Sequence, residues 1–303
     1  MLSFRKTAQV HVYCPEEYQK LISKILRHHK INFVLNEFNL QRGLPKVVCH
    51  YRSAEMTAEQ REFLVTATEM GAWVEPLISF LDRKVKYTET ELLNADYFLQ
   101  QKAFSILSNS GNKLWKRVFD FIASLIGIVC LSPILLLTAI AIKLESRGPA
   151  LYKQRRVGLY NTEFSVIKFR SMRTDAEKDG AKWAQKNDSR VTRVGKFIRK
   201  TRLDELPQLI NVLRGDMSII GPRPEREIFI IKLEKSIPYY RFRHAVRPGI
   251  TGLAQVKYPY GASTEDAIWK HKYDIYYIKH QSFLMDIKII LLTVKTILFA
   301  KGI

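Results

Sequence analysis

Residues 199–224, RKTRLDELPQLINVLRGDMSIIGPRP, hold the side chains best suited to chemistry. Asp204 and Glu205 are adjacent carboxylates with basic residues on both sides. Carboxylates among guanidinium groups stay ionised, and the same guanidinium groups bind phosphate oxygens in a bidentate way. A carboxylate can attack phosphorus while cations and a divalent ion neutralise charge in the transition state. The stretch therefore predicts phosphoryl transfer, with a plain helix cap as the structural alternative.

Pro207 sets the local structure expected around the two carboxylates. Proline is tolerated in a helix only near the first turn, so a helix should begin at about Leu203–Asp204. Asp204 would then be the N-cap and Glu205 would lie just inside, at a helix end that stabilises anions. Arg199, one turn earlier, is expected to bind phosphate, and Arg202 adds a further cation.

Two strand positions add candidate phosphate ligands. Lys168 and Arg170 alternate with apolar neighbours, so both should share one face of a strand. That face could bind phosphate or a nucleotide, and a solvated strand face fits the pattern equally well.

Two proline-containing segments add further candidates. Pro222, Arg223 and Pro224 form a rigid, extended tripeptide suited to present Arg223 to a diphosphate, with a structural turn as the alternative. Arg247 precedes Pro248 and Gly249 in a loop whose backbone can approach a ligand closely. A ligand-facing Arg247 and a structural one are both open.

Residues 121–142, FIASLIGIVCLSPILLLTAIAI, carry no charge. A straight helix of this length spans about 33 Å, enough for a hydrocarbon layer of about 30 Å. Both flanks are basic, whereas positive charge normally marks only the cytoplasmic end. Pro133 deprives the Val129 carbonyl of its helical partner and bends the helix, and Ser132 can bond that carbonyl locally. A spanning helix and a re-entrant helix both fit these residues.

The 303 residues carry a formal charge of +20, spread unevenly. Residues 1–112 hold 14 Lys/Arg against 12 Asp/Glu, whereas residues 113–303 hold 35 against 17. This asymmetry predicts two domains with different partners. A basic surface attracts nucleic acid, anionic lipid or a diphosphate substrate, but no nucleic-acid recognition motif is present, so nucleic acid is not an expected partner. The three cysteines have no metal-binding spacing and fit a reducing cytoplasm.

The first 112 residues predict a small parallel α/β layer. Strands are expected at 8–13, 31–36, 45–51 and 72–77, and helices at 15–29 and 57–70, the second ended by Gly71. No glycine-rich loop follows the first strand, so no nucleotide site is expected there. Residues 82–112 should be a connector with some helix that ends in the loop SNSGN at 108–112.

Six motifs stand in order in the second part of the chain: KRVFD at 116–120, the apolar segment with Ser132-Pro133, GPALYKQRRVG at 148–158, FSVIKFRSMRTDA at 164–176, the stretch at 199–224, and RPGITGLAQV at 247–256. With these motifs the segment from about Lys116 to the C-terminus resembles the bacterial monotopic phosphoglycosyl transferases, also called bacterial sugar transferases. The resemblance covers about 190 residues.

The resemblance implies a mechanism. Members use an Asp-Glu dyad, which falls here on Asp204 and Glu205. The Asp attacks the β-phosphate of a UDP-sugar, releases UMP and holds a covalent phosphosugar, which undecaprenyl phosphate then accepts. Mg²⁺ assists near Asp204, and the Glu orients the site or helps to activate the acceptor. The apolar segment would be a re-entrant helix, broken at Ser132 and Pro133 and in contact with membrane lipids. All other parts would then lie on the cytoplasmic face of the bacterial inner membrane.

The expected architecture is α/β with two domains. Residues 1–112 look like a shortened Rossmann-like accessory module with connector, without the helical bundle that usually precedes it. Residues 113–303 would form a membrane-associated α+β transferase domain, with a re-entrant membrane helix over 113–145 and amphipathic interfacial helices. The first module is open to docking, regulation or homo-oligomer formation. The sequence does not indicate which sugar is transferred, and a non-catalytic scaffold for glycan-assembly proteins is the alternative function.

Overall fold

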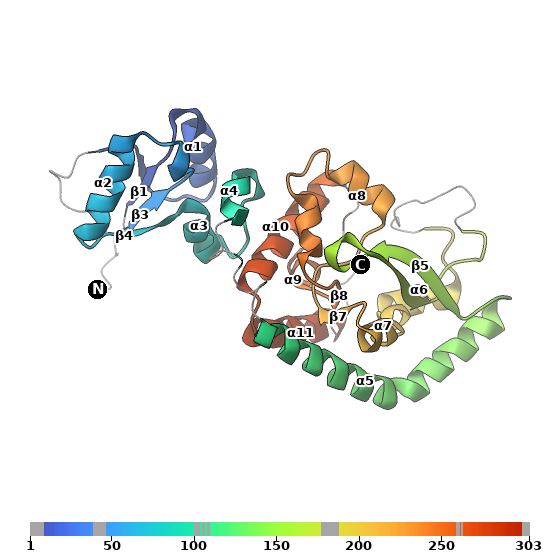
Figure 1. Cartoon of the computed structure of the whole chain (residues 1–303). Coiled ribbons are helices and arrows are strands. Elements are labelled where there is room, and N and C mark those ends of the chain that lie inside the picture. The colour runs from blue at the N-terminus through green and yellow to red at the C-terminus, as the bar shows by residue number, and fades with distance from the viewer. Residues whose placement is uncertain are drawn as a thin grey trace, which may run out of the picture. The chain divides into compact units, whose positions relative to one another are not determined.

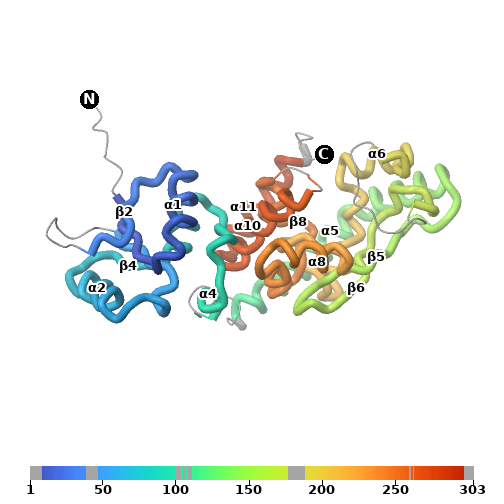
Figure 2. The backbone as a smooth tube through the Cα atoms, turned by 90° about the horizontal axis from the view of Figure 1, so that it is seen from above, coloured from blue at the N-terminus to red at the C-terminus, as the bar shows by residue number. Residues whose placement is uncertain are grey.

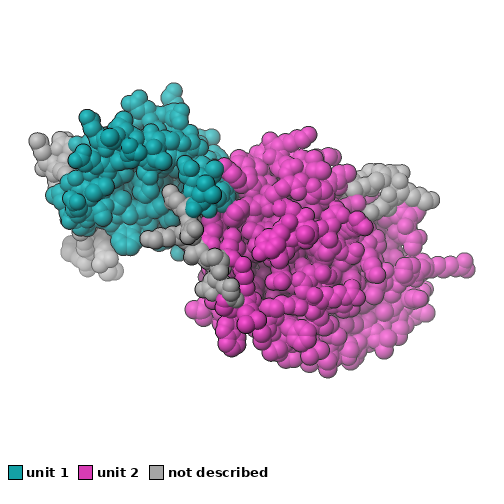
Figure 3. Space-filling model, in the orientation of Figure 1, with its two compact units in different colours: residues 1–99 teal, residues 100–303 magenta. Residues whose placement is uncertain are grey.

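The computed structural model describes residues 9–38, 47–99, 104, 107, 110–176, 188–258, 261 and 263–298 (Figure 1). They divide into two compact units, residues 1–99 and residues 100–303, which Figure 3 shows in separate colours. The mixed α/β class with a parallel sheet is confirmed. The boundary expected between residues 112 and 113 stays a prediction.

Unit 1 is built on a parallel sheet of four strands in the order β2-β1-β3-β4. The strands are β1 (Val10–Tyr13), β2 (Phe33–Leu35), β3 (Val47–His50) and β4 (Trp73–Pro76). Helix α1 (Gln19–His28) connects β1 to β2, and α2 (Ala58–Glu69) connects β3 to β4. Each strand and helix predicted in this unit is therefore confirmed. Helices α3 (Leu77–Val85) and α4 (Ala95–Leu99) follow the sheet, and α3 was not predicted.

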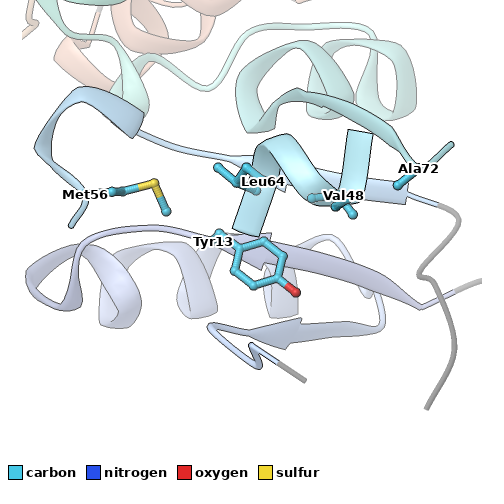
Figure 4. Close-up of a cluster of buried hydrophobic side chains, with 6 residues drawn as sticks. Tyr13, Val48, Met56, Leu64 and Ala72 are labelled. Carbon is cyan, nitrogen blue, oxygen red and sulfur yellow. The ribbon is translucent and has the colours of Figure 1, made fainter. Parts of the chain in front are cut away.

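Local signals in unit 1 explain why its helices were readable from sequence. Helix α2 begins with a capping box in which Thr57 and Gln60 bond each other's backbone N–H groups. It is followed by Gly71 at φ +90°, a left-handed conformation that glycine adopts without strain. The core between α2 and the sheet is apolar and closed (Figure 4); its buried members are Tyr13, Val48, Met56, Leu64, Ala67 and Ala72.

Unit 2 begins with α5 (Ser110–Glu145), which continues through Pro133. Figure 1 shows that this helix changes direction partway along its length. The Ser132 hydroxyl donates a hydrogen bond of 2.8 Å to the Val129 carbonyl. This is the bond expected for the carbonyl that Pro133 leaves without a helical partner. The predicted loop at 108–112 is wrong from Ser110 onward, because the glycine and asparagine there cost little beside the long helix that follows; residues 108–109 lie outside the described part of the chain.

The rest of unit 2 is a set of short strands and helices that lie along one side of α5 (Figures 1 and 2). Strands β5 (Leu151–Val157) and β6 (Glu163–Phe169) form an antiparallel hairpin, and β7 (Ser218–Ile220) pairs in parallel with β8 (Gly249–Thr251). The helices are α6 (Arg193–Lys200), α7 (Gln208–Arg214), α8 (Glu227–Leu233), α9 (Leu253–Lys257), α10 (Thr264–His280) and α11 (Phe283–Leu298).

Helix α5 leaves most of its apolar side chains exposed. Among the described residues, α5 is the one helix that is long and apolar enough to cross a membrane. Only 11% of its most apolar stretch of 18 residues is buried. Exposed members include Trp115, Ile126, Val129, Leu136 and Leu144. By contrast, Tyr276 and Tyr277 of α10 are buried. Apolar surface of this extent marks an interaction with lipid or another apolar partner.

Polar contacts fix the first turns of α5 to the rest of unit 2. Lys116 forms an ion pair of 2.7 Å with Asp286 of α11, and Asp120 accepts a bond of 3.1 Å from the Ile219 N–H of β7. Arg117 donates to the Val212 and Leu213 carbonyls at the end of α7. The motif KRVFD therefore anchors the apolar helix to the strands and helices that follow.

Candidate active site

Asp204 and Glu205 lie in a 3₁₀ turn, Leu203–Glu205, between α6 and α7. The expectation that Asp204 is a helix N-cap is wrong. Arg202, with a left-handed backbone at φ +60°, precedes the turn, and Pro207 is the N-cap of α7. Pro207 lacks an N–H, so the regular α-helical bonding pattern begins only after it. The carboxylates are therefore placed by a tight turn rather than by a helix end.

Glu205 is buried and forms ion pairs with the basic side chains around it. Its Oε1 lies 2.6 Å from Arg223 Nη2 and 3.0 Å from Lys168 Nζ, and its Oε2 lies 3.9 Å from Arg202 Nη1. Burial alone would raise the pKa of Glu205, but Arg223 and Lys168 outweigh it and hold that pKa well below its usual range. Glu205 is thus a fixed anion that orders three cations.

Asp204 differs from its neighbour. Its carboxylate is half-buried and makes no hydrogen bond or ion pair with any residue that the structure describes. Burial first, and then the charge of Glu205, raise the pKa of Asp204 to about 6, although Lys168, Arg223 and Arg199 act in the opposite direction. Near neutral pH the group is still mainly ionised. An anionic carboxylate without a fixed partner is suited to act as a nucleophile or as a metal ligand.

The loop with Arg223 is held by its backbone. The Pro222 carbonyl accepts from the Gly249 N–H at 2.9 Å, and the Arg223 carbonyl accepts from Arg243 at 3.1 Å. The Pro224 carbonyl accepts from Arg156 at 3.0 Å. Pro222 and Pro224 therefore contribute rigid backbone, while the Arg223 side chain reaches Glu205.

Four of the predicted cations gather around the carboxylates. Lys168, Arg202 and Arg223 contact Glu205, and Arg199 of α6 is close enough to lower the pKa of Asp204. Arg199 makes no side-chain bond with another described residue, so its guanidinium group is available to a ligand.

Arg170 does not share this site. It is buried, and its guanidinium group donates to the carbonyls of Ser146 and Arg147 at 2.8 and 2.9 Å, beyond the end of α5. The structure therefore does not bring Arg170 to the carboxylates that Lys168 contacts. The unpaired carbonyls at the end of a helix attract the donors of Arg170 instead.

Arg247 also contacts backbone. Its Nε donates to the Gly215 carbonyl at 2.9 Å, just after α7. The glycine that follows it serves the strand pair rather than a ligand, because a Cβ at Gly249 would lie 2.1 Å from the Gly221 nitrogen. Only glycine permits so close an approach of two backbones.

Comparison with known proteins decides the family. The family described as bacterial sugar transferase matches residues 111–300, which is more than half of the chain and includes every site residue above. The chain belongs to the bacterial sugar transferases.

Several curated relatives of this bacterial sugar transferase carry specific names. One from Aeromonas hydrophila, a UDP-N-acetylgalactosamine-undecaprenyl-phosphate N-acetylgalactosaminephosphotransferase, is 42% identical over 256 residues, covering 84% of this chain and 59% of the relative. A UDP-glucose:undecaprenyl-phosphate glucose-1-phosphate transferase from Caulobacter vibrioides is 44% identical over 187 residues, covering 61% of this chain and 70% of the relative.

A third, an undecaprenyl-phosphate glucose phosphotransferase from Komagataeibacter xylinus, is 45% identical over 195 residues, which are 62% of this chain and 37% of the relative. The chain therefore spans less than two thirds of the Aeromonas and Komagataeibacter relatives. The Aeromonas match is longer than the family region, so it extends into unit 1.

Two supporting residues of this bacterial sugar transferase were not predicted individually. Arg156 binds Gln154 and the Pro224 carbonyl and so steadies the Arg223 loop. Asn211 of α7 is fully buried; its amide accepts from the Ile167 N–H and donates to the Ser165 carbonyl, at 2.9 and 2.8 Å. Both lie inside motifs read from the sequence, but only the fold identifies their partners.

Proposed function

We propose that this protein transfers a sugar 1-phosphate from a UDP-sugar to undecaprenyl phosphate and releases UMP. The observation that carries the proposal is the contrast between the two neighbouring carboxylates. Glu205 is bonded to cations, whereas Asp204 carries an anionic carboxylate without a partner among the described residues. The names of the relatives from Aeromonas and Caulobacter support the two substrates.

The reaction proceeds in two balanced steps. A carboxylate oxygen of Asp204 attacks the β-phosphorus of the UDP-sugar, and the bond from that phosphorus to the bridging oxygen breaks, so UMP leaves with the electron pair. The phosphosugar is then esterified to Asp204. A phosphate oxygen of undecaprenyl phosphate attacks the same phosphorus, the bond to Asp204 breaks, and the carboxylate is restored. Arg199 and Arg223 stabilise the charge on the transferring phosphoryl group.

Mg²⁺ is proposed as the cofactor, with Asp204 as its protein ligand. Within the described residues no group of three or more His, Cys, Asp or Glu side chains could hold a metal ion. One unpaired carboxylate beside a phosphate-binding cluster fits Mg²⁺, which commonly takes one or two carboxylates and completes its shell with substrate oxygens and water. Bound there, the ion would supply positive charge to the diphosphate.

Helix α5 is proposed to be a re-entrant membrane helix at the cytoplasmic face of the bacterial inner membrane. The bend in the helix, the Ser132 bond to Val129 and the exposed apolar side chains support this topology. Lysines at both ends, Lys113 and Lys143, would then lie on one side. Single-cysteine variants at these two positions, on a background without native cysteines, should be labelled alike from outside intact cells. Labelling of only one would indicate a spanning helix.

Unit 1 is proposed to be a shortened Rossmann-like module. Its parallel strand order β2-β1-β3-β4, with helices as the connections, supports this description. A homo-oligomer formed through this unit is part of the same proposal.

The decisive experiment is UMP release by purified protein with Mg²⁺ and undecaprenyl phosphate. The donor panel must contain UDP-N-acetylgalactosamine and UDP-glucose, because the named relatives differ in their sugar. We expect release with at least one donor, and a mass increase of one phosphosugar when acceptor is withheld. Asp204→Asn should lower the rate by a factor of about 10³ or more and abolish the adduct.

Full activity of Asp204→Asn would reject the nucleophile. A folded wild-type protein that releases no UMP from any donor would instead favour the scaffold function.

A further inference from the structure

Gln208 is a buried polar residue that the proposed mechanism does not yet use. It is the first residue of α7 and is 2% exposed. Its Nε2 is buried and donates to no atom of the residues that the structure describes. A buried amide without an acceptor is costly, and few native groups are left in this state. An unpaired donor one turn from a catalytic carboxylate therefore needs an explanation.

Gln208 follows the turn that carries the carboxylates, three residues after Glu205. Hydrogen bonds from Leu206 to Leu203 and from Leu209 to Leu206 continue the i to i+3 pattern from the 3₁₀ turn into α7. Gln208 thus lies one helical turn beyond Asp204 and Glu205. Residues three and four apart along a helix are neighbours, and an Asp and a Gln at this spacing can form a hydrogen bond.

The neighbours of Gln208 along α7 are already paired. Glu205 has its ion pairs with Lys168 and Arg223, and Asn211, one turn further on, has both amide atoms bonded to β6. Asp204 is the acceptor in this turn that has no partner among the described residues. The turn therefore contains one unpaired donor and one unpaired acceptor of complementary kind.

We propose that Gln208 is a positioning residue, whose amide N–H binds one carboxylate oxygen of Asp204 when the donor substrate is bound. The inference rests on the proposed function. The bond fixes the rotamer of Asp204 and directs the other oxygen at the β-phosphorus of the UDP-sugar. After UMP has left, the same amide binds the carbonyl oxygen of the aspartyl ester, so the phosphosugar is held in line for the acceptor lipid. No additional reactant is needed.

The test uses Gln208→Met, which keeps the length of the side chain and removes the donor. In full-length protein we expect kcat for UMP release to fall by between about tenfold and a hundredfold, as for a lost hydrogen bond to a charged group. The KM for the UDP-sugar should change by less than about threefold, because the bond orients the nucleophile rather than binding the substrate. The melting temperature should stay the same or rise, since an unpaired buried amide is replaced by an apolar group.

Asn211→Leu is the matched control, since it removes a buried amide that is fully bonded on the same helix. Its melting temperature should fall. A similar fall in the melting temperature of Gln208→Met would show a structural role and overturn the proposal. An unchanged kcat would overturn it as well. So would a higher KM with normal kcat, which would indicate direct binding of the substrate. If the wild type itself releases no UMP, the proposed function fails separately, and the melting temperatures alone then decide whether Gln208 is unpaired.

Discussion

The two units handle buried charge in different ways. In unit 1 the buried acidic groups Glu75 and Glu89 form ion pairs with Arg83 and His29. In unit 2 three cations converge on Glu205, while the carboxylate next to it has no described partner. A one-to-one pair of opposite charges is neutral, whereas an excess of cations around one acid attracts an anionic ligand. The comparison locates function in unit 2.

Among the substitutions that compare the two units, neutralising Glu205 should have the largest combined effect on stability and turnover. Glu205→Gln leaves Lys168, Arg202 and Arg223 close together without their anion, so we expect unit 2 to lose about 3 kcal/mol of stability and UMP release to fall at least tenfold. Denaturant unfolding and the release assay measure the two effects.

Glu75→Gln in unit 1 is the control. Its partner Arg83 is half exposed, so a loss of only about 1 kcal/mol and normal turnover are expected. Equal effects of the two substitutions would remove the contrast between the units.

A core substitution in unit 1 should lower stability without lowering turnover. Leu64 is buried in the cluster of Figure 4, and Leu64→Ala removes packing worth about 3 kcal/mol. Calorimetry should show a lower melting transition for unit 1, while kcat per folded molecule stays at the wild-type value. A lower kcat in fully folded protein would show instead that unit 1 takes part in turnover.

The smallest expected effect is on the pH dependence of stability, when the buried His271 is replaced. Burial, and then the charge of Arg243, lower the pKa of His271 in unit 2 to about 3. The unfolded chain takes up a proton near pH 6.5, so the stability from neutral His271 is fully present above that pH and is lost as the pH falls toward 3.

Between pH 6.5 and 5, His271→Leu should therefore lose about 1.5 kcal/mol less stability than the wild type. Unfolding curves at the two pH values measure this difference. His28→Leu, at an exposed position in unit 1, is the control for adding leucine. Identical pH dependence in wild type and His271→Leu would contradict the prediction.

The sequence predicted local features and missed distant ones. The strands and helices of unit 1 were predictable because apolar patterns mark them and local signals bound them, such as Thr57 and Gly71 at the two ends of α2. The charge cluster was predictable because Arg202, Asp204 and Glu205 are close in sequence. The partners of Arg170 and Arg247 were not predictable because their acceptors, the carbonyls after α5 and α7, lie 23 and 32 residues away along the chain. A cation that binds phosphate and a cation that bonds the carbonyls at a helix end look the same in sequence. Only their tertiary contacts distinguish them.

The clamp that Arg117 forms on the last carbonyls of α7 has a mechanical consequence. The opposite end of α7 follows directly from the turn with Asp204 and Glu205. A tilt of α5 would therefore be passed through α7, a helix of seven residues, to the turn that holds Asp204 and Glu205. The thickness and lateral pressure of a surrounding bilayer would act on α5 directly, and through α7 they would affect the position of the two carboxylates.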